Sequence, residues 1–209
     1  MPHLQIITAS TRPSRKGPAV AAWFIEQARR HGMFDLEPVD LAELDLPLLD
    51  EPNHPRLREY EHAHTRRWSE LVDRADAFVV VTPEYDHGPP ASLVNALQFL
   101  AQEWAYKPMG FVGYGGVSAG TRSINTLKMT VAALRMMPIP EAVTIPFFAK
   151  SLDEGTGAFS PTEVQERASV SMLDELHRWA EALGPLRSDG RGGRRDGLEG
   201  RGRSEGGRP

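Results

Sequence analysis

Cysteine is absent from this 209-residue sequence, and its absence excludes disulfide bonds, metal sites with cysteine ligands and a cysteine nucleophile. The same absence fits a reducing compartment. The sequence also lacks any run of about 18 apolar residues, so we expect no membrane span. The apolar start over residues 1–8 is too short for a signal peptide, and we therefore expect a soluble cytoplasmic protein.

Positive charge is also in short supply, because 24 Lys and Arg stand against 28 Asp and Glu, a formal net charge of −4. This balance argues against general binding to nucleic acid or to a membrane surface. Apolar residues are plentiful. A hydrophobic content of 40% is enough for a sizeable core, and the length suits one α/β domain.

Short apolar runs alternate with helical patterns along most of the chain. The expected strands are residues 4–9, 34–41, 77–82, 108–114 and 141–147, and the expected helices are residues 19–31, 59–75, 91–103, 119–136 and 161–183. This alternation predicts a parallel sheet with helices on both faces. Five strands fit a flavodoxin-like, doubly wound sheet in three α/β/α layers. The unbroken, β-branched run AFVVVT at 77–82 is typical of a central strand.

The composition changes at Gly184. The last 26 residues hold nine glycines and seven arginines against four acidic residues, with almost nothing apolar to bury. We therefore predict a folded domain over residues 1–183 and a disordered Gly/Arg-rich tail over residues 184–209. Such tails sometimes bind RNA, but this one has no aromatic residue, which favours a solvated, dispensable extension.

The first of three loops of interest follows the first expected strand, over residues 10–17. In parallel α/β sheets, ligands bind beyond the carboxyl ends of the strands. Hydroxyl and guanidinium groups are supplied there by Ser10, Thr11, Arg12, Ser14 and Arg15. The N-terminus of the next helix favours a phosphate, and the planar fork of arginine meets two phosphate oxygens. No Walker pattern or dinucleotide fingerprint occurs, so the loop predicts a phosphate site, with an ordinary basic loop as the alternative.

The other two loops follow the third and fourth expected strands. Residues 83–90 hold three prolines, which fix the backbone, and one aromatic residue, Tyr85. Residues 114–120 carry the pair Gly115 and Gly116, which lets backbone amides approach a ligand. Each loop alone could be a plain turn. Together at one edge of the sheet, the three loops predict a site for a flat, phosphate-bearing molecule.

Three stretches together resemble the NAD(P)H-dependent FMN reductases of the flavodoxin-like superfamily. They read STRPSR at 10–15 followed by GPAV at 17–20, TPEYDHG at 82–88 followed by NAL at 95–97, and KPMGFVGYGG at 107–116 followed by Ser118, Gly120 and Arg122. The resemblance extends over about residues 4–180, in the right order and spacing.

The resemblance implies an FMN enzyme that takes hydride from NADPH or NADH and passes electrons to a small acceptor by ping-pong kinetics. The acceptor could be free flavin, a quinone, an azo compound or a metal ion. The residues that match the FMN-binding loops are, for the phosphate, Ser10, Arg12, Ser14 and Arg15; for one side of the ring, Pro83, Glu84, Tyr85 and Asp86; and for its other edge, Tyr114, Gly115 and Gly116.

The resemblance also implies a homodimer or homotetramer with flavin sites near the subunit interface. The apolar and aromatic content around Phe99, Trp104 and Tyr106 suits such an interface. One position departs from the family pattern, which commonly reads Pro-Glu-Tyr-Asn where this chain has Asp86. An amide donates and accepts hydrogen bonds, whereas an ionised carboxylate only accepts. Asp86 should therefore point away from the ring or lower the flavin potential.

Three other functions fit parts of the sequence. A non-enzymatic, flavodoxin-like electron carrier shares the fold, but the phosphate loop of such carriers typically lacks arginines. Residues 116–120 match the nucleophile elbow of serine hydrolases, with Ser118 as nucleophile, yet the only downstream histidine, His177, falls within an expected helix. His54, His62 and His64 could gather around a metal, although His62 and His64 would face different sides of a helix. We expect solvated histidines and no metal site.

Overall fold

The computed structural model describes the backbone of residues 1–192 and the side chains of residues 1–187. The strands are β1 His3–Thr8, β2 Asp35–Asp40, β3 Ala77–Pro83, β4 Pro108–Tyr114 and β5 Met137–Ile145. The α-helices are α1 Gly17–His31, α2 Leu41–Leu44, α3 Ala63–Arg74, α4 Ala91–Gln98, α5 Thr121–Ala133 and α6 Glu163–Gly192. Short 3-10 helices span Pro55–Leu57 and Phe148–Ser151.

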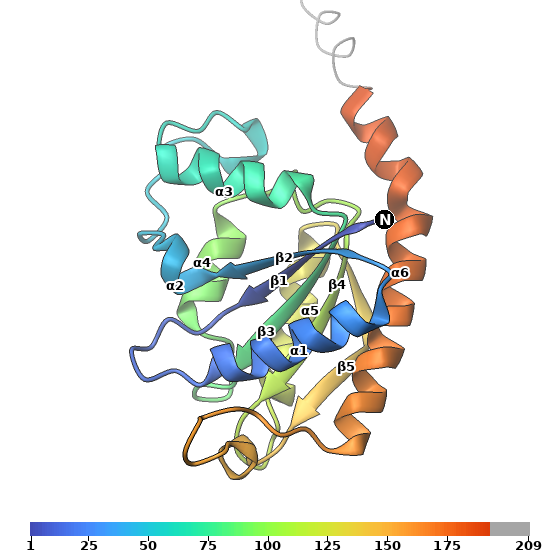
Figure 1. Ribbon diagram of the computed structural model, residues 1–209. Helices are drawn as coiled ribbons and strands as arrows, with labels where there is room; N and C mark the ends of the chain where they lie inside the picture. The colour runs from blue at the N-terminus through green and yellow to red at the C-terminus, as the bar shows by residue number, and fades with distance from the viewer. Residues whose placement is uncertain (193–209) are drawn as a thin grey trace, which may run out of the picture.

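All five strands run parallel in the order β2-β1-β3-β4-β5, which confirms the predicted doubly wound sheet (Figure 1). Strand β3 is central, and every residue of β3 and β4 is buried. The strand order changes direction at β1, because its two neighbours in the sheet, β2 and β3, both follow it in the sequence. The carboxyl ends of β1, β3 and β4 therefore lie side by side at one edge of the sheet.

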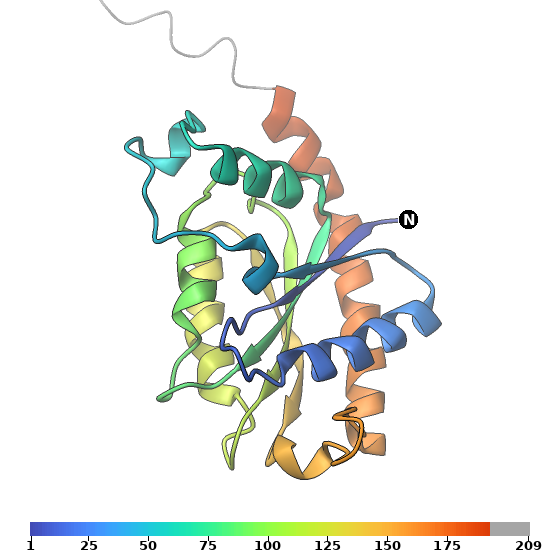
Figure 2. The ribbon, with the colours of Figure 1, turned by 60° about the vertical axis from the view of Figure 1, so that its left-hand side comes forward.

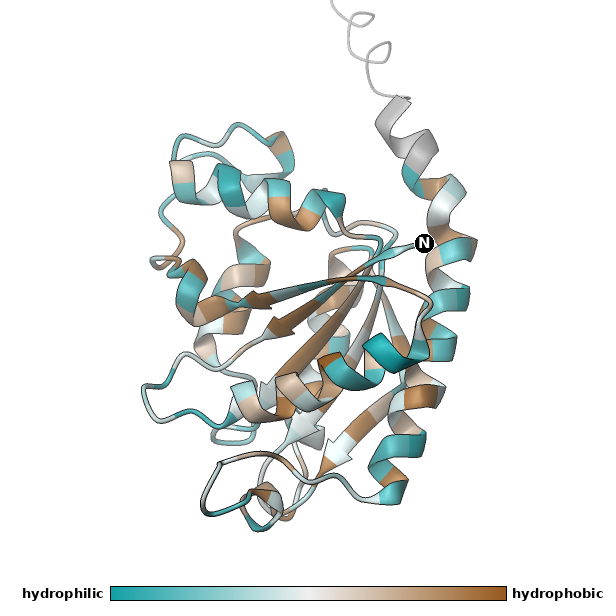
Figure 3. Ribbon diagram, viewed as in Figure 1, coloured by the Kyte–Doolittle hydropathy of each residue, from teal (hydrophilic) through white to brown (hydrophobic). Residues whose placement is uncertain are grey.

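Helices α1 and α6 cover one face of the sheet, and α3, α4 and α5 cover the other (Figures 1 and 2). Each face has its own apolar cluster. The strands are mainly hydrophobic, and hydrophilic residues gather on the outer sides of the helices (Figure 3). No helix within the described residues is long and apolar enough to cross a membrane.

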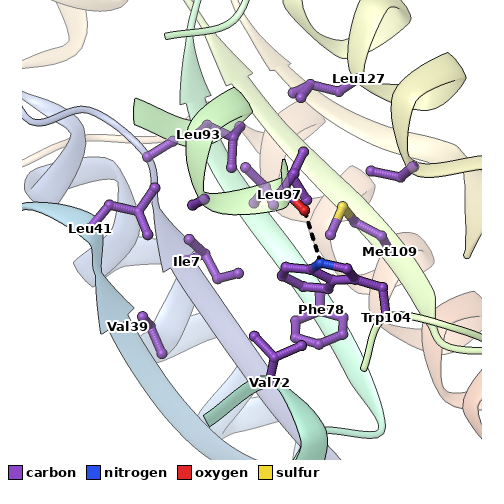
Figure 4. Close-up of a cluster of buried hydrophobic side chains, with 14 of the residues drawn as sticks. Ile7, Val39, Leu41, Val72, Phe78, Leu93, Leu97, Trp104, Met109 and Leu127 are labelled. Atoms are coloured by element: carbon purple, nitrogen blue, oxygen red, sulfur yellow. Dashed lines mark hydrogen bonds between the residues drawn. The ribbon is translucent and has the colours of Figure 1, made fainter. Parts of the chain in front are cut away.

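Two aromatic residues that we expected near a subunit interface belong instead to the core of the single chain. Phe99 and Trp104 are fully buried. The Trp104 ring packs edge-on against Phe78 at 5.0 Å between centroids, and its indole Nε1 donates to the Leu97 carbonyl at 3.2 Å (Figure 4). Neither side chain can contribute to an interface without unfolding this cluster, so that part of the prediction is wrong.

Several boundaries differ from those predicted, each for a local reason. Helix α3 begins at Ala63 and not at 59, because the Glu51 carboxylate accepts from the backbone N–H groups of Glu61 and His62. Helix α4 ends at Gln98, and residues 99–104 turn into the core. The short helix α2, which we did not predict, begins where the Asp40 side chain accepts from the Ala42 N–H.

Strand β5 begins at Met137, earlier than the predicted residue 141. This earlier stretch contains Pro138 and Pro140, which are tolerated because β5 is an edge strand, where a missing N–H costs no ladder bond on the open side.

Helix α6 continues to Gly192, so the predicted domain boundary at residues 183 and 184 falls inside it. Pro185 lies within the helix. Two residues later, the Arg187 guanidinium bonds to the Asp76 carboxylate at 2.9 Å and to the Tyr106 carbonyl at 3.2 Å, which ties this end of α6 to the sheet. Residues 184–192 of the predicted tail are thus helical in the structure. The rest of the predicted tail, residues 193–209, lies outside the described residues.

Candidate functional site

The first loop joins β1 to the N-terminus of α1. Pro18 occupies the first turn of α1, no side chain caps the helix, and no acidic residue stands in its first turn. The helix N–H groups and the positive end of its dipole are therefore left for an external anion. Ser10 is fully buried, and its hydroxyl lies 2.7 Å from the Tyr85 hydroxyl.

The two arginines of the first loop differ in their surroundings. Arg15 donates to the Asp40 carboxylate at 2.7 Å, and its buried Nε has no hydrogen-bond partner among the described residues. Arg12 is exposed and lies over the Tyr85 ring, 5.4 Å from the ring centroid. Arg12 is thus the more available cation. Asp40, at the end of β2, contacts the first loop through Arg15, and the sequence analysis missed it. The same edge rule that selected the loops would have found it.

The second loop contains a tight two-residue turn. Tyr85 and Gly88 exchange both backbone hydrogen bonds at 2.9 Å, and Asp86 and His87 between them have positive φ angles of 47° and 67°. Asp and His enter this left-handed region more readily than most residues. The Asp86 side chain is exposed. Asp and Asn both suit this turn position, so the backbone does not require the amide that the family pattern shows.

The third loop is tied to the second by the Glu84 N–H, which donates to the Tyr114 carbonyl at 3.1 Å. Its two glycines have different surroundings. A Cβ at Gly115 would lie 3.4 Å from the Gly120 nitrogen, whereas a Cβ at Gly116 would meet nothing within 4 Å. Gly115 therefore packs against the protein. The space beside the Gly116 Cα is open to a ligand, although the Gly116 carbonyl already accepts from the Ala119 and Phe147 N–H groups.

Glu84 does not direct its carboxylate into open space. The side chain is 5% exposed and accepts from the Ser118 hydroxyl at 2.7 Å, the Arg122 guanidinium at 2.7 Å and the Arg122 N–H at 3.1 Å. Burial alone would raise the pKa of Glu84, but the hydrogen bonds from Ser118 and Arg122 hold that pKa below its ordinary value. The carboxylate thus fastens the second loop to the start of α5, and only the backbone of Glu84 is left for a ring.

The Tyr114 side chain reaches back toward the first loop, not to the far edge of the site as we expected. A Cβ at Gly17 would lie 2.7 Å from the Tyr114 hydroxyl, so glycine is required there. That hydroxyl is buried and has no hydrogen-bond partner among the described residues. Burial and the neighbouring Tyr85 raise the pKa of Tyr114, and the Ser10 hydroxyl and the guanidinium groups of Arg15 and Arg12 oppose the rise. Tyr114 therefore belongs with the predicted phosphate loop.

The three loops thus form one continuous surface at the carboxyl edge of the sheet. Arg12 contacts Tyr85 across the first and second loops, and a Cβ at Gly115 would lie 3.7 Å from the Cβ of Glu84 across the second and third. Ser14 is exposed in the first loop, and Pro83 is buried as the last residue of β3. The predicted site residues are therefore brought together, with Ser14 and Asp86 at its exposed margin.

The alternative chemistries do not assemble in the described part of the chain. The Ser118 hydroxyl donates to Glu84 and contacts no imidazole, while His177 lies on α6 with its ring against Phe34. His62 precedes α3 and its ring stacks on that of His64 at 5.2 Å, so the expectation that they diverge is wrong. Even so, no group of three or more His, Asp or Glu placed to hold a metal occurs among the described residues.

Comparison with known proteins gives three concordant results. Residues 2–150 match the family described as NADPH-dependent FMN reductase. An NAD(P)H-dependent FMN reductase of Schizosaccharomyces pombe is 39% identical over 149 residues, which is 69% of this chain and 74% of that protein. An FMN-dependent NADPH-azoreductase of Staphylococcus saprophyticus is 28% identical over 173 residues, 82% of this chain and 91% of its own.

Among solved structures, the fold is similar to that of FerB, a flavoenzyme NAD(P)H:(acceptor) oxidoreductase from Paracoccus denitrificans. The TM-score is 0.68 at 22% identity, over 88% of this chain and 99% of that one. At this identity the likeness supports the flavodoxin-like fold and nothing finer.

Proposed function

The chain belongs to the NADPH-dependent FMN reductase family, and we propose that the three loops at the carboxyl edge of its sheet are the FMN site. The protein is an FMN-dependent NAD(P)H oxidoreductase. The observation that carries the site proposal is the junction of loops one and two. There, the Ser10 and Tyr85 hydroxyls meet, Arg12 lies over the Tyr85 ring with no ion pair among residues 1–187, and the N-terminus of α1 has no side-chain cap.

The residues present fit the phosphate of FMN. Two buried polar atoms beside the first loop, Arg15 Nε and the Tyr114 hydroxyl, have no partner among the described residues. Leaving such atoms unsatisfied is costly, and a phosphate has acceptor oxygens that suit both. Arg12 and the α1 N–H groups supply charge and further donors. We propose that Ser10, Arg12, Ser14 and Arg15 hold the phosphate, with Tyr114 as an additional donor.

The residues present also fit the flat ring. The proline-fixed backbone around Tyr85 and the exposed Gly116, where an added Cβ would meet nothing within 4 Å, lie at the same edge of the sheet. The Glu84 carboxylate, bonded to Ser118 and Arg122, sets the spacing between these two loops. We propose that Pro83, Glu84, Tyr85 and Asp86 line one side of the ring through their backbone, and Gly115 and Gly116 the other.

When bound, FMN supplies the two-electron chemistry, so the protein needs no acid or base of its own for hydride transfer. The work of this chain is positional. Its loops would hold the ring and would have to leave one face open for NADPH or NADH and then for the acceptor. That shared face predicts ping-pong kinetics, in which the oxidised nicotinamide leaves before the acceptor enters.

For the acceptor, we propose a flat aromatic compound such as a quinone, an azo compound or a free flavin, in preference to a metal ion. Two exposed apolar side chains flank Gly116. Val117 is 75% exposed and Phe147 is 51% exposed, and the Phe147 N–H donates to the Gly116 carbonyl at 3.0 Å. Apolar surface beside the open backbone suits a stacked ring better than a hydrated cation.

The test is anaerobic reduction of the FMN-loaded protein by NADPH and by NADH, followed by addition of each acceptor. Bleaching of the flavin absorbance by a nicotinamide and its recovery with a quinone or an azo dye would support the proposal. Absence of FMN uptake at micromolar concentration would refute the site. Recovery with ferric citrate but with no aromatic acceptor would refute the acceptor class alone. A homodimer or homotetramer and a cytoplasmic location stay predictions, and gel filtration with light scattering tests the first.

A further inference from the structure

A cavity lies at the edge of the sheet where the strands begin, opposite the proposed FMN site. Its volume is about 430 Å³, within the range of small-molecule sites. It is lined by the residues that precede β4 and β5 and by the ends of α3 and α5, together with Arg56, Arg58 and Arg187. In Figure 1 the arrowheads of the strands point away from this end, so the cavity and the proposed FMN site lie at opposite edges.

The cavity is basic in a protein that is acidic overall. Its lining holds five cationic side chains, from Arg56, Arg58, Lys107, Arg135 and Arg187, and two carboxylates, from Asp73 and Glu103, a formal excess of three positive charges. The whole chain has a formal net charge of −4. Positive charge is therefore concentrated at this cavity, although the net charge of the whole chain is negative.

The two carboxylates are already engaged. Glu103 is fully buried and accepts from Tyr60 at 2.8 Å and Ser69 at 2.7 Å, and the Arg58 guanidinium lies within 3.4 Å of both Glu103 and Asp73. By contrast, Arg56 and Arg135 have exposed side chains, and within residues 1–187 only their backbone groups are hydrogen-bonded. These two guanidinium groups are the cations left to meet a ligand.

The backbone around the cavity is strained. Arg58, Tyr106 and Arg135 have positive φ angles of 56°, 61° and 61°, three of the eight such non-glycine residues in the described chain. Glycine would adopt these angles without strain. The Tyr106 N–H donates to the Arg135 carbonyl at 2.9 Å, which fixes two of the strained residues against each other. Strained residues of this kind cluster at functional sites, where a particular side chain is needed despite the energetic cost of its backbone conformation.

We propose that this cavity binds a small organic phosphate, whose phosphate group is met by Arg56 and Arg135. Guanidinium forks recognise phosphate through paired, charge-assisted hydrogen bonds. The Tyr106 ring and the apolar side chains of Ala105, Ala133 and Leu134 give the rest of the ligand an apolar surface. The ligand class is therefore a phosphate ester with an apolar or aromatic body, of about the size of a mononucleotide.

The test is calorimetric titration of the FMN-loaded full chain with AMP, with adenosine as the neutral control. FMN loading occupies the proposed flavin site, so AMP cannot bind through the first loop. The variant is the pair Arg56→Ala and Arg135→Gly, since glycine preserves the positive φ at position 135. The matched control is Arg29→Ala, an exposed arginine on α1. Flavin absorbance and the melting temperature verify that each variant is folded.

We expect AMP to bind the wild type and the control alike, adenosine to bind at least tenfold more weakly, and the double variant to lose at least tenfold in AMP affinity. Equal binding of AMP and adenosine would show that no anion is recognised and would overturn the proposal. Unchanged AMP affinity in the double variant would do the same. So would an absence of AMP binding together with a dimer that the double variant abolishes, because the cavity would then receive a second copy of the chain.

Discussion

The hydroxyl of Ser10 lies 2.7 Å from the hydroxyl of Tyr85, although the two residues are 75 positions apart in the sequence. Strands β1 and β3 pair in parallel with Thr8 opposite Val81, so the loops that leave them emerge side by side. The loop that we propose for the phosphate is therefore joined to the loop that we propose for the ring without any ligand.

This pair can be measured by a double-mutant cycle of Ser10→Ala and Tyr85→Phe in the FMN-free protein. Each single change should lower the free energy of unfolding by about 0.5–1.5 kcal/mol, the usual contribution of a neutral hydrogen bond, and the double variant should lose less than the sum. Urea unfolding measures the effect. Tyr106→Phe is the control, because that hydroxyl makes no hydrogen bond among residues 1–187. Strict additivity would show that the two hydroxyls do not interact.

Replacing Arg12 by alanine should weaken FMN binding by about 1.5–3 kcal/mol, the range for a hydrogen bond to a charged group. Arg12→Lys should fall between the two, since lysine keeps the charge but lacks the planar fork. Quenching of flavin fluorescence on titration with the FMN-free protein measures the affinity. Arg29→Ala, at the far end of α1, should leave it unchanged. Wild-type affinity in Arg12→Ala would remove Arg12 from the phosphate site.

The order of the elements and the edge that carries the site could be predicted from the sequence. The β-branched run at 77–82 is typical of a central strand, and β3 is indeed central and fully buried. Once parallel topology is assumed, the loops after β1, β3 and β4 must share an edge. This rule alone was enough to predict that Ser10, Tyr85 and Gly115 lie at the same edge of the sheet.

The directions of side chains beyond the strand ends could not be predicted. Glu84 turns to Ser118 and Arg122, and Tyr114 turns to Gly17, because local packing and not strand alternation decides where these side chains point. Long-range contacts also decide where some helices end, which the local sequence pattern does not reveal. Arg187 is an example, because its bond to Asp76 ties the end of α6 to the sheet.

Glu84→Gln should loosen the junction between the second and third loops. The amide keeps the shape of the side chain but loses the charge that faces Arg122, so the charge-assisted bonds weaken. We expect a loss of about 1–3 kcal/mol in stability and weaker FMN binding, with the hydrogen–deuterium exchange of residues 84–88 and 115–118 faster than in the wild type. If exchange instead became uniformly faster across the whole domain, the substitution would cause general destabilisation, and Glu84 would not specifically fasten the second loop to the third.

Acid stability should depend on Glu37. Although burial alone would raise the pKa of this carboxyl, its hydrogen bonds with Arg74, His3 and Gln5 lower the pKa from 4.5 to about 2. A carboxyl whose pKa is lower in the folded protein stabilises the fold at pH values above its unfolded-state pKa. That contribution is lost as the pH falls through its folded-state pKa. The stability difference between wild type and Glu37→Gln should therefore be constant above about pH 5.5 and shrink between 4.5 and about 2.

Urea unfolding at a series of pH values measures this difference. Glu154→Gln, at an exposed loop position, is the matched control and should follow the wild type throughout. A difference between wild type and Glu37→Gln that stays the same down to pH 3 would show that Glu37 has the same pKa in the folded and unfolded chain.

Phe147 offers a test of the acceptor that leaves the cofactor untouched. Its side chain is half-exposed beside Gly116, its φ is 47°, and the Lys150 ammonium lies 5.4 Å from its ring centroid. Phe147→Ala should raise KM for a quinone or an azo dye severalfold, because a stacked aromatic pair contributes about 0.5–1.5 kcal/mol beyond its buried area. Reduction of the bound flavin by NADPH and the affinity for FMN should stay near their wild-type values. Since ping-pong kinetics separate the two half-reactions, stopped-flow measurement of each assigns the effect to one of them. An equal slowing of both would place Phe147 in the support of the flavin, and an unchanged KM for every aromatic acceptor would remove it from the acceptor's path.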